Sequence, residues 1–70
     1  MNCSEILVKS FYEDMTIASV PLSIPPFKIG DTVNDGAGTI ISMRCAEPLN
    51  GIERMIMVIK GKIEDNKLYI

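Results

Sequence analysis

The spacing of turn-forming residues is the strongest constraint that this sequence places on its fold. Few stretches run longer than about ten residues before a proline, a glycine or a turn-forming pair interrupts them. These interruptions are Pro21, Pro25-Pro26, Gly30, Gly36, Gly38, Pro48, Asn50-Gly51, Gly61 and Asp65-Asn66. Stretches of this length suit strands better than helices. The sequence therefore predicts an all-β domain, either a small barrel or a partly open antiparallel sheet of five to six short strands.

The clearest strand is expected at residues 54–60. Its apolar side chains occupy both alternating faces, as in a strand that is covered on both sides. Its predicted partner is the stretch 39–43, across a loop that contains Pro48 and Asn50-Gly51. Residues 27–33 are expected to form a turn and a short strand, with Ile29 and Val33 pointing inward.

The two ends of the chain are expected to form hairpins. Residues 62–64 and 67–70 are predicted to pair around Asp65-Asn66, because Asp and Asn tolerate left-handed backbone dihedrals. Residues 5–12 and 15–20 are predicted to pair around Glu13-Asp14. A short helix is the alternative for this N-terminal part, since the four residues that begin at Ser10 match a capping box.

The size of the chain limits its stability. Its 70 residues and 7.7 kDa fit one domain, residues 1–70. Burying the apolar surface of such a chain contributes roughly 100 kcal/mol. Ordering its residues costs about 105 kcal/mol. Because these figures nearly cancel, we expect a disulfide, a metal, self-association or a partner to add stability.

Metals and membranes are not expected. The chain has no histidine, and its two cysteines, Cys3 and Cys45, lack the paired spacing of a zinc site, so we predict no metal and no cofactor. The start of the chain lacks the basic region of a signal peptide, and no stretch reaches the ~20 apolar residues of a membrane span. These features predict a cytoplasmic protein with two reduced, structural cysteines; a Cys3–Cys45 disulfide is the alternative.

Residues 27–41 resemble part of a known fold family. Phe27, Gly30-Asp31 and Val33 are followed by a short turn and then by Gly36-Ala37-Gly38-Thr39-Ile40-Ile41. This string resembles the opening of SH3-like small barrels of the KOW and related translation or transcription types. The resemblance implies an SH3-like barrel and no particular activity. The matching loop at 34–38 is acidic, whereas nucleic-acid-binding members of the family typically have basic loops.

The residue types that catalysis needs are not combined in this sequence. Neither cysteine has a histidine to act as its base. The close acidic pairs fall at predicted turns, where carboxylates are solvated. Gly36-Ala37-Gly38 precedes a strand, whereas phosphate-binding loops precede a helix. We therefore predict no enzymatic activity and no small-molecule substrate.

Nucleic-acid binding is the alternative function. Residues 52–70 carry four bases and three acids, a net charge of +1, whereas residues 1–51 carry three bases and six acids, a net charge of −3. The pI near 4.9 disfavours binding to a polyanion. The candidate contacts are Arg54, Lys60, Lys62 and Lys67.

Protein association is the predicted function. Five methionines in 70 residues is a high share, and methionine is common at adaptable contact surfaces. A small barrel covers one face of the 54–60 strand well, so we expect the other face to meet a second subunit or a partner. The alternative is that the N-terminal segment covers it. The predicted contacts are Met55, Met57, Ile59 and Tyr69, with Phe11 and Tyr12 as a second patch. Such a chain suits a self-associating accessory subunit or an inhibitor of a larger complex, of a kind that phages encode.

Overall fold

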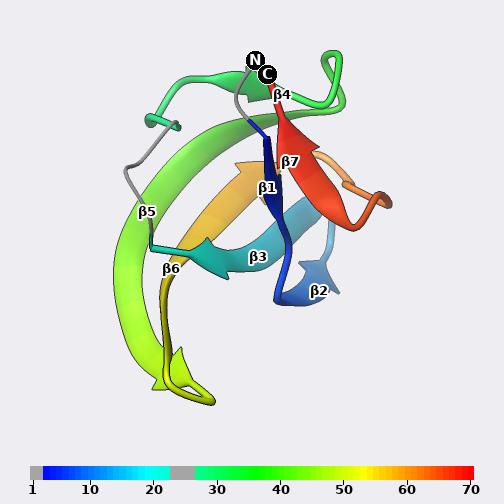
Figure 1. The fold of residues 1–70 in the computed structure, drawn as a ribbon. Helices are drawn as coiled ribbons and strands as arrows, with labels where there is room; N and C mark the ends of the chain where they lie inside the picture. Colours follow the sequence, from blue (N-terminus) through cyan, green and yellow to red (C-terminus); the bar gives the residue numbers. More distant parts are fainter. Residues whose placement is uncertain (1–2, 23–26) are drawn as a thin grey trace.

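The computed structural model describes residues 3–22 and 27–70, and within them the chain is all-β, as predicted. It has seven strands: β1 (Cys3–Glu5), β2 (Val8–Tyr12), β3 (Met15–Pro21), β4 (Thr32–Val33), β5 (Gly38–Leu49), β6 (Ile52–Lys60) and β7 (Lys67–Tyr69). Five of them form an antiparallel sheet in the order β2-β3-β6-β5-β4, which curls into a half-barrel (Figure 1). The interruption at Pro25-Pro26 lies outside the described residues. Among those described, no helix is long and apolar enough to cross a membrane.

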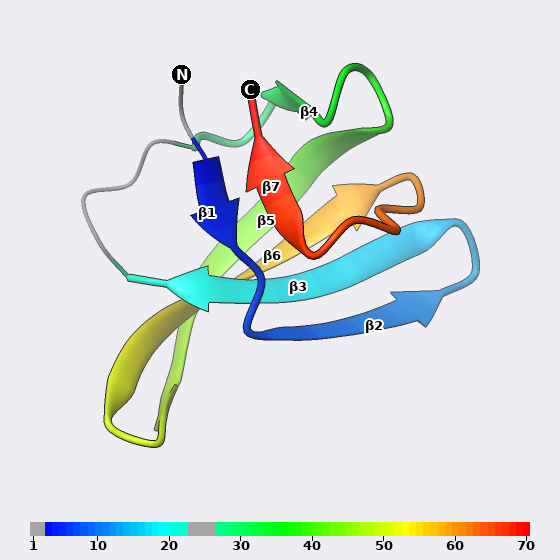
Figure 2. The same cartoon turned by 45° about the vertical axis from the view of Figure 1, so that its right-hand side comes forward.

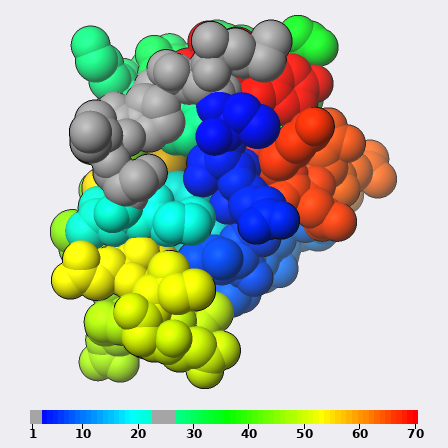
Figure 3. All heavy atoms as spheres, in the orientation of Figure 1, coloured from blue at the N-terminus to red at the C-terminus, as the bar shows by residue number. Residues whose placement is uncertain are grey.

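Two tight turns join neighbouring strands where the sequence predicts them. Tyr12 lies opposite Met15, so β2 and β3 form the N-terminal hairpin and the alternative helix is wrong. β5 and β6 turn at Asn50-Gly51, where φ is 51° and 79°, whereas Pro48, which was predicted to lie in this loop, is part of β5. Two consecutive positive φ angles are the requirement of a type I′ turn, which Asn-Gly meets best. This hairpin extends beyond the body of the molecule in the space-filling view (Figure 3).

The central pairing of the sheet is the predicted one, over a longer range. Ile40 lies opposite Ile59, and Met43 lies opposite Met57. Between these pairs the register shifts by one residue at Ile41. A bulge of this kind bends a strand and increases its twist. It therefore contributes to the curl that turns the sheet into a half-barrel.

The core lies between the inner face of the curled sheet and the small β1–β7 sheet. Its buried apolar residues are Ala18, Val20, Phe27, Val33, Ile40, Met57, Ile59, Ile63 and Leu68. β1 and β7 cross over the inner face in both ribbon views (Figures 1 and 2). Leu68 of β7 is fully buried there, and Ile6, which follows β1, packs against the same cluster.

The predicted C-terminal hairpin is wrong. β7 pairs with β1, with Cys3 opposite Tyr69, and not with residues 62–64. The buried hydroxyl of Thr16 explains this difference, since it donates to the Gly61 carbonyl over 2.7 Å and accepts from the Ile63 amide over 2.9 Å. These bonds hold residues 61–63 against β3 and leave β7 free to pair elsewhere.

The segment before β4 matches the prediction at one of two positions. Val33 is fully buried, as predicted, whereas Ile29 is 63% exposed and does not point inward. A local turn accounts for this, because the Lys28 amide donates to the Asp31 carboxylate over 2.8 Å and the Asp31 amide donates to the Lys28 carbonyl over 3.1 Å. The turn directs Ile29 into solvent.

Candidate protein-binding surface

The five-stranded sheet has a second face, opposite the core, which we call the outer face. Side chains alternate between the two faces of a strand, so the register assigns residues from all five strands to the outer face. These residues are Val8, Ser10 and Tyr12 of β2, Met15, Ile17, Ser19 and Pro21 of β3, Thr32 of β4, Thr39, Ser42, Arg44 and Ala46 of β5, and Ile52, Arg54, Ile56, Val58 and Lys60 of β6. β1 and β7 lie over the inner face, so none of the described strands covers the outer face (Figure 2).

Aliphatic side chains form the centre of the outer face. Ile17 lies opposite Val58, and Ile56 is in the next row, opposite Ser19; all three aliphatic side chains are half-buried. At the edge of the sheet, Val8 is 47% exposed and Tyr12 is 60% exposed. Apolar side chains that gather on an uncovered face are characteristic of an interaction site.

The charges of the outer face are all positive. Arg44, Arg54 and Lys60 belong to it, and none of its residues is acidic. The whole chain has a net charge of −2, so the remaining residues carry −2 − 3 = −5. The turn acids Glu13 and Asp14 lie beyond the end of the β2–β3 ladder. The fold therefore separates a cationic face from an acidic remainder.

A small depression opens on the outer face above Ser19. Its volume is about 70 Å³, and it is lined by Val8, Ser10, Ile17, Ala18, Ser19, Arg54 and Ile56. Ser19 is 2% exposed, and its hydroxyl oxygen has no hydrogen-bond partner. The Arg54 Nε–H donates to the Glu47 carbonyl over 2.9 Å. The depression thus combines apolar walls with one buried hydroxyl and one guanidinium.

Two of the predicted contact residues lie in the core, so the prediction needs correction there. Met57 is 2% exposed and Ile59 is fully buried, whereas Met55 is half-buried and packs against the same cluster. The inner face holds these residues because β3 places small or short side chains opposite them, Ala18 against Met57 and Thr16 against Ile59. The neighbouring residues Ile56 and Val58 instead lie on the uncovered face. The sequence predicted that both faces of this strand are apolar, but the predicted contacts Met57 and Ile59 lie on the face that the core buries.

Phe11 and Tyr12 are exposed, as their predicted role requires, but do not form one patch. They are adjacent in β2 and therefore point to opposite faces of the sheet. Tyr12 belongs to the outer face. The Phe11 ring lies 5.5 Å from the Lys9 Nζ and 5.9 Å from the Lys62 Nζ, measured to the ring centroid. Of the two, only Tyr12 extends the outer face.

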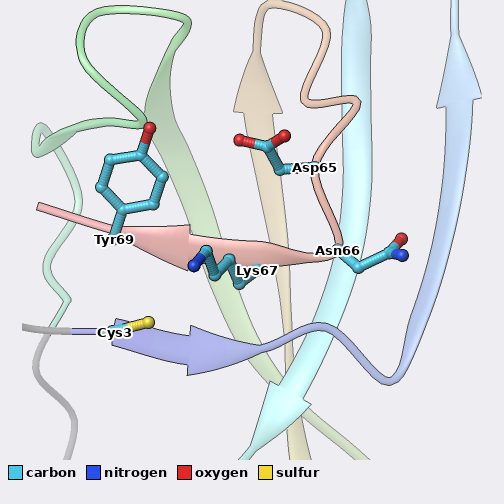
Figure 4. Close-up of a pocket in the computed structure, with 5 residues that line it drawn as sticks. All are labelled: Cys3, Asp65, Asn66, Lys67 and Tyr69. Atoms are coloured by element: carbon cyan, nitrogen blue, oxygen red, sulfur yellow. The ribbon is translucent and has the colours of Figure 1, made fainter.

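Tyr69 lies at a second, larger depression, on the outward side of the β1–β7 sheet. This depression has a volume of about 420 Å³ and is lined by Cys3, Asp65, Asn66, Lys67 and Tyr69 (Figure 4). The Tyr69 hydroxyl donates to the Asp35 carboxylate over 3.3 Å. Partial burial, together with the negative charge of Asp35, raises the pKa of the Tyr69 phenol above its usual value. Tyr69 therefore stays a neutral hydrogen-bond donor at neutral pH.

The four basic residues of the alternative function are not brought together. Arg54 and Lys60 belong to the outer face, Lys62 lies beside Phe11, and Lys67 is on β7 across the molecule. Arg44, which the sequence did not single out, joins Arg54 and Lys60 because it lies opposite Ile56. The alternation of side chains along β5 could have placed Arg44 on this face, but only if the register between β5 and β6 had been known.

The cysteines and the carboxylates are dispersed. Cys3 and Cys45 are both free and exposed, so they are not buried structural residues and do not form a disulfide. Among residues 3–22 and 27–70, no three side chains of the metal-binding types are grouped to hold an ion.

No known protein family, no curated protein and no solved structure matches this chain. The resemblance of residues 27–41 to the opening of SH3-like barrels therefore stays a prediction.

Proposed function

We propose that this chain is a non-enzymatic protein-binding module and that it binds its partner through the outer face. The observation that carries the proposal is the combination of Ile17, Ile56 and Val58 with three cations on a face that no described strand covers. A rigid sheet holds these side chains in place before a partner arrives, which lowers the entropic cost of binding. In this proposal the chain acts as a small accessory subunit or as an inhibitor of a larger complex.

The charge pattern favours a different protein over a second copy as the partner. In a two-fold dimer built from two outer faces, the cations of one copy would face those of the other. Like charges across an interface oppose association. The proposed partner is therefore a protein whose contacting surface is not cationic.

Site-specific cross-linking in the native host tests the proposal. A photoreactive amino acid replaces Ser42, which is half-buried on the outer face, and the matched control carries the same group at Lys67 on β7. We expect one discrete protein to be cross-linked from position 42 and not from position 67. The added substitution Val58→Asp should abolish this product, because it places a charge in the apolar centre of the face.

Two results would contradict the proposal. The first is a product that forms equally from both positions. The second is a product from position 42 that survives Val58→Asp while circular dichroism shows that this variant is folded.

A further inference from the structure

We infer that the outer face binds an acidic segment with apolar side chains from a partner protein, and that one carboxylate of this segment binds at the depression above Ser19. This inference rests on the proposed function and adds the chemistry of the partner to it. It follows from three features of the same face: its charge, its unpartnered hydroxyl and the position of Arg54.

The positive charge of the outer face favours a partner surface of negative charge. Arg44, Arg54 and Lys60 are the only charged residues of the outer face, while the rest of the chain carries −5. Exposed charges more than ~10 Å apart are largely screened at 0.1 M salt, so a docking segment responds mainly to the charges of the face itself. An acidic segment is attracted there, and its apolar side chains can cover Ile17, Ile56 and Val58.

The hydroxyl of Ser19 supplies an unused donor. It is 2% exposed and has no hydrogen-bond partner. A buried polar group without a partner costs about 1–3 kcal/mol, and most buried groups in proteins avoid this cost. A carboxylate oxygen that reaches this hydroxyl accepts a hydrogen bond from a donor whose desolvation cost was already incurred on folding. Ser19 therefore favours an acceptor in the depression.

Arg54 brings a positive charge to the same place. It lines the depression, and its Nε–H is held by the Glu47 carbonyl over 2.9 Å. A guanidinium has five N–H donors, so the others remain for a carboxylate, the group that its planar fork matches best. Ser10 adds a second hydroxyl to the lining. The site thus offers donors on one side and aliphatic walls on the other.

A nucleic acid fits this face less well than an acidic protein segment. Single-stranded nucleic acids bind through stacking on aromatic side chains along a basic groove. Tyr12 is the one aromatic residue of the outer face, and its centre is aliphatic. The net negative charge of the rest of the chain also opposes a long polyanion.

Titration of the isotope-labelled chain with designed probe peptides tests the inference. The first probe is a short peptide with blocked ends that contains leucine and aspartate, and the second has asparagine in place of every aspartate. A peptide with lysine at these positions and an oligothymidylate of similar length complete the set. Chemical-shift changes of the backbone amides report both the affinity and the surface that is used.

We expect the acidic peptide to bind and to shift amides of β2, β3 and β6. Its affinity should fall as salt rises from about 0.05 to 0.3 M, because screening weakens contacts between exposed charges. The asparagine peptide should bind roughly tenfold more weakly, since it lacks the charge-assisted bonds. The lysine peptide and the oligothymidylate should bind more weakly still.

Two variants separate a binding role of Ser19 from a structural one. Ser19→Ala should raise the melting temperature, because it removes the unpartnered hydroxyl. The same variant should bind the acidic peptide about tenfold more weakly. Arg54→Gln should lower the affinity for the same peptide by about fivefold. The matched control Lys67→Gln on β7 should change neither measurement. The asparagine peptide should bind Ser19→Ala and the unmodified chain alike.

The outcomes distinguish this inference from the proposed function. It is overturned if the aspartate and asparagine peptides bind equally, if the shifts fall on β7, or if the oligothymidylate binds most tightly. It is also overturned if Ser19→Ala leaves the affinity for the acidic peptide unchanged. If these tests fail while cross-linking from position 42 still captures a partner, the proposed function holds and only the acidic chemistry is wrong.

Discussion

Asn34 and Tyr69 are 35 residues apart in sequence, and two hydrogen bonds join them in the fold. The Tyr69 amide donates to the Asn34 Oδ1 over 3.0 Å, and the Asn34 amide donates to the Tyr69 carbonyl over 2.8 Å. The Asn34 Nδ2 also donates to the Lys67 carbonyl over 2.9 Å. Asn34 thus acts as a partner for the edge of β7 that β1 does not occupy. It ties the β1–β7 sheet to the turn between β4 and β5.

Replacing Asn34 with alanine should lower the free energy of unfolding by about 3 kcal/mol. The substitution leaves the Tyr69 amide and the Lys67 carbonyl without their side-chain partner. It also places a residue with a Cβ and no compensating side-chain bond at φ 55°. Urea unfolding followed by circular dichroism measures the change.

Asn34→Gly is the matched control for the backbone term. It removes the same hydrogen bonds but tolerates the positive φ, so it should be less destabilised than Asn34→Ala by roughly 1 kcal/mol. If both variants are as stable as the unmodified chain, Asn34 does not hold β7 in place.

Replacing Gly61 with alanine should destabilise the chain by more than about 2 kcal/mol. Its φ is 121°, and an added Cβ would overlap the backbone carbonyl oxygen of Ala37. The Gly61 amide also donates to the Asp14 carbonyl over 2.7 Å, so the backbone cannot move away without losing this bond. Thermal unfolding of the variant measures the loss.

Gly30→Ala provides the comparison for Gly61→Ala. Gly30 has a φ of 100°, but nothing lies within 4 Å of an added Cβ. The cost there should come from backbone strain alone, about 1 kcal/mol. Equal losses in the two variants would show that the close approach of Ala37 to Gly61 does not matter.

Charges introduced at neighbouring positions of β6 should have opposite consequences. Met57→Asp buries a carboxylate without a partner in the core and should unfold the chain. Val58→Asp lies on the half-buried outer face and should cost no more than about 1–2 kcal/mol. Circular dichroism and melting temperature distinguish them. A folded Met57→Asp would contradict the assignment of the inner face to the core.

Alkaline pH should weaken the fold through Tyr69. Burial and Asp35 raise the pKa of its phenol in the folded state, whereas the unfolded phenol ionises near pH 10. Above that pH the folded state keeps a proton that the unfolded state has lost. The contribution of this group to stability is therefore complete below about pH 10 and is lost as pH rises through the folded pKa.

Comparison with Tyr69→Phe isolates this effect. The unmodified chain should lose stability more steeply than the variant between about pH 9 and pH 11, measured by urea unfolding at each pH. The ionisation of the lysines is common to both proteins and cancels in the comparison. Parallel pH profiles would mean that folding does not raise the pKa of the Tyr69 phenol.

The all-β class and two of the turns were predictable because they depend on neighbouring residues. Asn50-Gly51 accepts two positive φ angles wherever the chain places it, and frequent prolines and glycines leave no room for long helices. The strand at 54–60 and its pairing with β5 follow from the same local pattern. These features needed no knowledge of distant contacts.

The choice of inner and outer face was decided only in the folded molecule. Both faces of β6 are apolar, so alternation alone cannot show whether Met57 or Val58 points to the core. The deciding contacts come from the β1–β7 sheet, which covers one face only, and β1 lies at the other end of the chain from β6. The same holds for the C-terminal strand, which Thr16 and Asn34 direct to β1. Local residues determine backbone dihedrals, whereas the register and covering of a face depend on how the whole chain closes.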